Sequence, residues 1–432
     1  MTFRTGGLAA ILLAGFLGVP AAQAQQGTDC SAPTDWFPHA QTPPPDDNAD
    51  FNSNCAFHLW SWQAFLFLTQ NDDDGMPRFL SLIPAQDVVD GVPDTEPDEV
   101  MLRPRARKSD MGETFDEVGQ AGSLGLLVDQ NGRAVYYSMY VNQTYYDFVV
   151  TQNQYNVPAN LLAAPADQNY PIGSVTLKAA WKIMGADEDA SGFFIMPATI
   201  EKLSADAAGN VIADPGRTEE VTVALVGLHV VGIVKGHPEA IWATFEHRNN
   251  APQFSLGQLI DDPVSSQDFT FYAANTTAGE CNQNNAAFLT LTDPATQTLS
   301  PVTQVCRQYP FGGGSTQNSA NIGSLNSTVH AGLEADSIWR NYMETGAIWF
   351  SQADALEPNM AMDGSIITGS VKLSNSVIET FTQKVRSEDQ CFSCHRTDMV
   401  FPPDAVDQPL PGKNLNISHI LLNAYVQNLE AK

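Results

Sequence analysis

The stretch Cys391-Phe392-Ser393-Cys394-His395 near the C-terminus constrains this chain more than any other feature. Two cysteines at this spacing can reach one edge of a flat ring, and the histidine that follows can then lie under its centre. The spacing is the CxxCH signature, in which both thiols form thioethers to a haem and the histidine binds the iron. A redox disulfide or half of a zinc site are the alternatives, but neither a thioredoxin-like βαβ context nor further close ligands surround the motif. The motif therefore predicts one covalent haem c.

The first 24 residues have the pattern of a secretory signal peptide. Arg4 gives a positive start, a short apolar run follows, and Ala22-Gln23-Ala24 is a small-x-small cleavage site. No later apolar run approaches the roughly 20 residues that a transmembrane helix needs. Because haem is attached to CxxCH outside the cytoplasm, both features predict an exported protein, periplasmic in a Gram-negative cell, whose mature chain begins at Gln25.

The composition is strongly acidic, with a formal net charge of −28 over 432 residues. This charge argues against nucleic acid or an anionic membrane as a partner. It favours a basic one, such as a redox partner protein with a basic docking surface, although a need for solubility explains it equally well. The 43% apolar and 9% aromatic residues suffice for a large folded core, built as one large domain or as two to three smaller ones.

Four cysteines remain outside the motif, and they form two local pairs in the sequence. The simplest connectivity for an oxidising compartment joins Cys30 to Cys55 and Cys281 to Cys306. Each bond would close a loop of about 25 residues, which is worth roughly 3 kcal/mol in the chain-entropy treatment. Three connectivities are possible for four cysteines, and closeness in sequence favours this one.

Residues 121–250 predict a mainly antiparallel sheet that is buried on at least one face. Two β-rich runs flank Asn131-Gly132, which is a strong hairpin signal. β-branched and aromatic residues, separated by clusters of Gly, Pro, Asn and Asp, predict further strands. These strands are expected over 174–184, 219–234 and 240–247.

Helices and loops are expected on either side of this sheet region. The periodicity of apolar residues predicts a buried helix over 55–70, and a helix that runs into a strand over 333–350. Proline, acidic and amide residues instead predict long loops over 71–120 and 251–330. Short helices are expected over 374–390, directly before the motif, and over 416–432 at the end of the chain.

These elements together predict an α+β fold with a signal peptide at 1–24, a large β-rich domain over 25–370 and a small helical haem-binding region over 371–432. The order of helix, CxxCH, Pro/Gly-rich loop and last helix in 371–432 resembles the cytochrome c family. The WATFEH segment at 242–247 also resembles strings in large exported proteins that end in a single CxxCH. That second resemblance implies no particular activity.

The resemblance raises the question of the sixth iron ligand. The cytochrome c family usually takes it from a methionine in the loop before the last helix, but 400–416 contains no methionine. Met399 is too close to His395 to reach the opposite face of the ring, and His419 is expected to turn away from the apolar face of the last helix. The remaining candidates belong to the large domain: Met360, Met362, His330, His229, His237 and His247. We therefore expect this domain to cover the distal face of the haem, with either a ligand or an open pocket.

The histidines also suggest a separate metal site. His58 lies in the predicted helix over 55–70, and His229, His237 and His247 lie in the sheet region. No two of them have short ligand spacing, so hydrogen-bonded structural roles are the more typical interpretation.

Two functions of different class fit the sequence. The first is a mono-haem c-type cytochrome that transfers electrons. The alternative is a haem enzyme of the peroxidase or oxygenase type, favoured by a chain that is much longer than the roughly 100 residues of a small domain. A third interpretation makes the large domain a ligand-binding or scaffold module with the haem as its redox outlet. No GxSxG, Walker or Rossmann fingerprint occurs, and this favours electron transfer.

Overall fold

The computed structural model describes residues 30–47, 51–73, 75–91, 101–102, 125–362, 364–383, 390–402 and 405–430. The expected signal peptide at 1–24 and the mature start at Gln25 lie outside these residues. The same holds for much of the predicted loop over 71–120 and for part of the predicted helix over 374–390.

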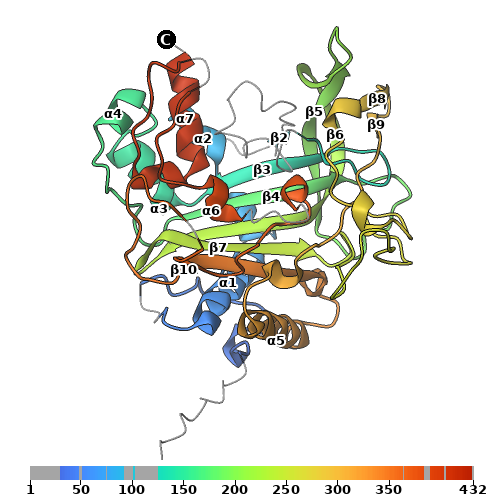
Figure 1. Ribbon diagram of the computed structural model, residues 1–432, viewed down its shortest axis with the longest axis horizontal. Coiled ribbons are helices and arrows are strands. Elements are labelled where there is room, and N and C mark those ends of the chain that lie inside the picture. The colour runs from blue at the N-terminus through green and yellow to red at the C-terminus, as the bar shows by residue number, and fades with distance from the viewer. Residues whose placement is uncertain are drawn as a thin grey trace, which may run out of the picture.

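A large, mainly antiparallel sheet organises the fold (Figure 1). Its main path runs in the order β1 (Ile83–Pro84), β3 (Val135–Val141), β4 (Val175–Ile183), β6 (Val211–Val234), β7 (His237–His247), β10 (Tyr342–Phe350) and β11 (Ile367–Gly369). β5 (Ile195–Ala205) pairs with the first part of β6 and, in parallel, with β2 (Met101–Leu102). A separate hairpin joins β8 (Thr290–Asp293) to β9 (Thr298–Ser300). The α+β class with a large antiparallel sheet is confirmed.

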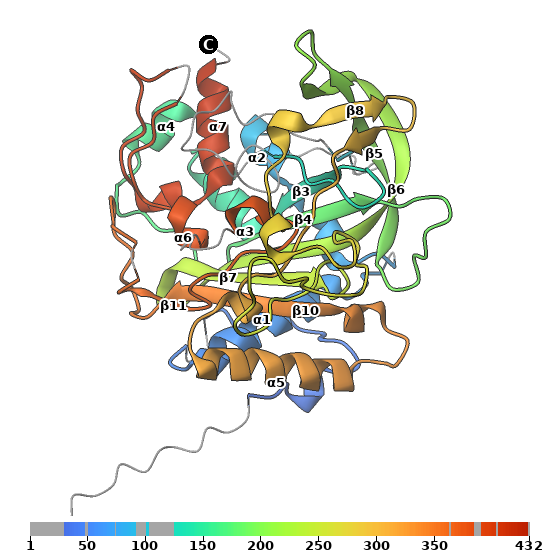
Figure 2. The ribbon, with the colours of Figure 1, turned by 45° about the vertical axis from the view of Figure 1, so that its right-hand side comes forward.

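Helices cover both faces of this sheet (Figure 2). One face, called here the α1/α5 face, packs against α1 (Asn54–Thr69) and α5 (Thr316–Gly332). The opposite face, called the C-terminal face, lies beneath α2 (Ala85–Asp90), α3 (Gln143–Tyr146), α4 (Pro158–Ala163), α6 (Cys391–Cys394) and α7 (His419–Glu430). Each face has its own apolar core.

The α1/α5 face is closely packed around aromatic rings. Phe65 of α1 stacks on Phe245 of β7 with 4.3 Å between ring centroids. Gly232 of β6 lets α1 approach, because a Cβ at this position would lie 2.3 Å from the Trp60 ring. Trp60 and Phe65 are both buried, so this face is sealed from solvent along α1.

The predicted strands of the sheet region are present, with changes at their ends. The expected strands at 174–184, 219–234 and 240–247 correspond to β4, the second part of β6, and β7. The Asn131-Gly132 turn also forms, with φ +77° at Gly132, but on its first side only the bridge from Val128 to Ala134 pairs. β5 and the first part of β6 were not predicted.

The helices at 55–70 and at the end of the chain are confirmed as α1 and α7, but three other expectations were wrong. α5 lies within the predicted loop over 251–330: Ser315 caps it, and only Ile322, Leu325 and Val329 supply its buried apolar stripe. α2 lies within the predicted acidic loop over 71–120. The described part of 374–390 holds no α-helix before the motif, only turns and a 3-10 turn at Thr380–Thr382. Over 333–350 the strand β10 is preceded by a short 3-10 helix, Ile338–Asn341.

Both expected disulfides are present. Cys30 is bonded to Cys55 and Cys281 to Cys306, each with Cα atoms 5.6 Å apart. The first ties the N-terminal segment to the start of α1. None of the helices in the described ranges has the length and apolar character needed to cross a bilayer.

Candidate functional site

A cavity lies between the C-terminal face of the sheet and the segments that carry the CFSCH motif. It encloses about 1110 Å³ of empty space, its open mouth included. The sheet wall consists of Met139, Thr176, Leu177, Lys178, His229, Val231, Ile233, Ala240 and Trp242. The opposite wall includes Tyr145, Tyr170, Cys391, Cys394, His395, Ile417, Ser418, His419 and Ile420. All three residues predicted to bind haem therefore face one cavity.

One helical turn, α6, places both cysteines of the motif at this cavity. Residues three apart in a helix lie on the same side, so Cys391 and Cys394 both line the wall. Phe392 between them turns away into the core, where its ring lies 4.9 Å from that of Phe350. Gln390 and Ser393 form a capping box that starts this turn.

The imidazole of His395 is held on three sides. Its ring centroid lies 3.8 Å from that of His419, which is stacked on it, and 4.1 Å from the Trp242 ring. His395 Nδ1 lies 2.9 Å from the carbonyl oxygen of Ile417 and donates to it. The proton of the neutral ring then resides on Nδ1, which leaves Nε2 as the nitrogen with a lone pair for a metal.

Of the two candidates near the motif, His419 and Met399, the structure places only His419 differently from its prediction. His419 was predicted to turn away, but it lines the cavity and is 4% exposed. The prediction assumed that Ile417 and His419 belong to one α-helix. Instead, Ile417 ends a separate 3-10 turn, Asn414–Ile417, and α7 begins only at His419. Met399 is 43% exposed and does not line the cavity.

Of the candidates in the large domain, only His229 lines the described walls of the cavity. His330 Nε2 donates to the Tyr342 carbonyl, and His247 Nε2 to the Gly192 carbonyl, at 2.6 and 2.9 Å. His237 Nδ1 pairs with Glu239 at 2.8 Å. Met360 and Met362 pack at the edge of the core on the C-terminal face.

The alternative of a separate site built from His58, His229, His237 and His247 finds no support. Each makes a hydrogen bond or an ion pair with a different partner. Across the part of the chain that the structure describes, no group of three or more His, Cys, Asp or Glu side chains is arranged to hold a metal ion.

His229 forms an ion pair that the sequence did not reveal. Its Nε2 lies 3.0 Å from Oε1 and 3.2 Å from Oε2 of Glu379, and both residues line the cavity. The Asn375 backbone N–H donates to the same carboxylate at 2.9 Å. These two residues are 150 positions apart, so no local pattern could have shown the pair.

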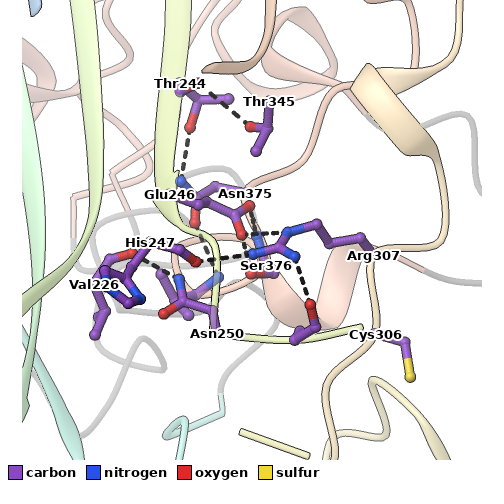
Figure 3. Close-up of polar contacts among 12 residues, drawn as sticks. Val226, Thr244, Glu246, His247, Asn250, Cys306, Arg307, Thr345, Asn375 and Ser376 are labelled. Atoms are coloured by element: carbon purple, nitrogen blue, oxygen red, sulfur yellow. Dashed lines mark hydrogen bonds and ion pairs between the residues drawn. The ribbon is translucent and has the colours of Figure 1, made fainter. Parts of the chain in front are cut away.

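A buried polar network holds the segment that carries Glu379 against the sheet (Figure 3). Glu246 of β7 accepts from Arg307 Nε at 2.8 Å and from the Ser376 backbone N–H at 2.6 Å. The Asn375 side chain donates to Thr244 Oγ1 at 2.7 Å. Gly227 of β6 lies opposite Glu246 in the strand register, and a Cβ at this position would lie 2.7 Å from Val377. The segment that carries Val377 and Glu379 therefore packs directly on β6.

The walls suit an amphiphilic ring such as haem. Most are apolar or aromatic, and burial raises the pKa of Tyr145 to about 12, so this phenol is neutral at physiological pH. Lys178 adds a cationic side chain. The Ser174 hydroxyl lines the cavity and is buried without a hydrogen-bond partner among the described residues. A water or a polar group of a bound molecule would satisfy this hydroxyl.

Comparisons with protein-family models, with curated proteins and with solved structures found no match to this chain.

Proposed function

We propose that this protein is a periplasmic mono-haem c-type cytochrome that transfers electrons, with its haem in the cavity between the sheet and the CFSCH segment. The observation that carries the proposal is that Cys391, Cys394 and His395 line a single cavity.

The residues of the chain have separate roles in holding the group. The thiols of Cys391 and Cys394 would each add S–H across one vinyl double bond, so two C–S bonds form and no atom is lost. His395 would bind the iron through Nε2, while the Ile417 carbonyl fixes the tautomer and the Trp242 and His419 rings fix its plane. When bound, the iron supplies one-electron oxidation and reduction.

The partner proposed for electron transfer is a redox protein with a basic docking surface. The support is the formal net charge of −28, which attracts a basic protein and speeds the encounter at low ionic strength. Export to the periplasm rests on the sequence of residues 1–24 and agrees with the two disulfides, which form in oxidising compartments.

A haem enzyme of the peroxidase or oxygenase type is the second candidate. The specific observation that favours it is that the His229–Glu379 pair lines the cavity, because electron transfer alone requires no acid or base there.

Intact mass and a pyridine haemochrome spectrum of the exported protein test the main proposal. We expect the mature chain plus the mass of one haem, and a reversible one-electron redox titration. The Cys391→Ala/Cys394→Ala variant should lose the haem, whereas Cys281→Ala/Cys306→Ala, which removes the same number of sulfurs elsewhere, should retain it. A mature wild-type chain without added haem mass would rule the proposal out.

A further inference from the structure

The His229–Glu379 pair places an imidazole and a carboxylate at the cavity in addition to the residues of the CFSCH motif. The His229 side chain is 10% exposed and that of Glu379 is 21% exposed, so small molecules in the cavity can reach them. Elsewhere in the described chain the histidine ion pair His58–Glu344 is fully buried, with 0% exposure of both side chains.

The pairing decides which nitrogen of His229 carries the proton. A carboxylate only accepts hydrogen bonds, so Nε2, which faces both Glu379 oxygens, is the N–H donor. Nδ1 then carries a lone pair, and it has no hydrogen-bond partner in the part of the chain that the structure describes. A carboxylate that fixes the tautomer in this way also stabilises the imidazolium that forms when the ring takes up a proton.

The pair is held in a fixed position before any ligand binds. Glu379 accepts from the Asn375 backbone N–H at 2.9 Å, and Asn375 is itself bonded to Thr244 on the sheet. His229 belongs to β6, in the centre of the sheet, opposite Thr244 of β7. Groups held by a strand and by a network of buried hydrogen bonds lose little entropy when they act on a ligand.

His229 and His395 border the same space. Trp242, whose ring contacts His395, lies opposite Val231 of β6 in the strand register. His229 is two residues before Val231 on the same face of the strand, a distance of about 7 Å along it. The His229 imidazole therefore lines the same cavity as His395, one strand away from Trp242.

We propose that His229, oriented by Glu379, is the base that takes the proton from a small protic ligand entering this cavity, with hydrogen peroxide and small hydroperoxides as the natural class. The inference rests on the proposed haem. The ligand H–X would give its proton to Nδ1 of His229, and the anion X⁻ would keep the bonding electron pair, with which it could bind an iron held at His395. No group changes oxidation state in this step.

Cyanide is the probe, because it enters as HCN at neutral pH and binds ferric iron as the anion. We expect the ferric protein to bind it, and His229→Gln to lower the association rate constant roughly 100-fold, the lower end of general-base effects. Glu379→Gln should lower it less, since the base remains but its tautomer is no longer fixed. His237→Gln, which removes the imidazole of a His–Glu pair that does not line the cavity, should leave the rate unchanged.

Carbon monoxide on the ferrous protein provides the control without a proton. Its association rate should change less than about twofold in the same variants, since no base is needed. Equal losses for both ligands would mean that His229 only shapes the cavity, and would overturn the inference. So would a wild-type ferric protein that carries haem but ignores cyanide, or a change from low to high spin on His229→Gln, which would make His229 an iron ligand.

Failure of the inference and failure of the proposed function are distinguishable. Intact mass, measured before any ligand is added, decides whether haem is attached, and its absence removes both proposals. With haem attached, each cyanide result above bears on His229 alone. If His229→Gln does not fold, the comparison of cyanide with carbon monoxide in Glu379→Gln decides the question.

Discussion

The two faces of the sheet each hold a histidine paired with a glutamate, in opposite surroundings. On the α1/α5 face, His58 Nδ1 lies 2.7 Å from Glu344, and its Nε2 lies 2.9 Å from Asn318 Oδ1. Both of its nitrogens therefore donate to oxygen atoms of the protein. On the C-terminal face, His229 uses one nitrogen for Glu379 and borders a cavity.

The two pairs differ in whether the imidazole keeps an accessible lone pair: His58 does not, and His229 does. Burial alone would lower the pKa of His58, but the charge of Glu344 and the hydrogen bonds that His58 donates to Glu344 and Asn318 outweigh it, and the pKa is raised. The raised pKa favours the imidazolium, in which both ring nitrogens are N–H donors and neither has a lone pair to offer. His229 keeps a lone pair on Nδ1 and is accessible, so the same two residue types have different uses on the two faces.

The largest expected loss of stability comes from breaking the fully buried His58–Glu344 pair. Glu344→Ala should lower the free energy of unfolding by roughly 3 to 5 kcal/mol, because it leaves a buried imidazole without its charged partner. Urea denaturation followed by circular dichroism measures this. Glu344→Gln, which keeps a hydrogen-bond acceptor, should cost less. A loss below about 1 kcal/mol for the alanine variant would show that burial on this face does not set the strength of the pair.

A second prediction uses His247, another imidazole on the α1/α5 face. Burial lowers its pKa to about 4, despite the hydrogen bond to the Gly192 carbonyl. Between pH 6.5 and 4 the unfolded chain binds this proton and the folded one does not, so stability falls on acidification. In this window, His247→Gln should reduce the slope of the free energy of unfolding against pH by about 1 kcal/mol per pH unit. An unchanged slope in urea titrations at several pH values would contradict it.

The smallest loss of stability is expected from breaking the partly exposed His229–Glu379 pair. Glu379→Ala should lower the free energy of unfolding by only about 1 kcal/mol, since a partly exposed ion pair is screened by water. The matched comparison is Glu344→Ala, measured in the same denaturant series. If the two alanine variants lost equal stability, the distinction between the faces would be wrong, and the exposed pair would be a structural element.

How much the sequence could predict depended on how local each feature is. The CFSCH motif, the two disulfides and the strands β4 and β7 are visible in short stretches, because spacing and alternation act between neighbours. α5 was missed because polar Asn318 and Asn321 are buried in it, through bonds to α1 residues more than 250 positions away. Long-range hydrogen bonds override a weak apolar pattern.

The sequence by itself determined the chemistry available to this protein: two thiols and an imidazole at the CxxCH spacing, four cysteines for two disulfides, and an excess of acidic residues. Only the tertiary structure decided which residues meet that motif. It brings Trp242 and His419 against His395, and Glu379 against His229 across 150 residues. Those contacts depend on how the C-terminal segments pack on the sheet, and packing between distant segments leaves no periodic signal in the chain.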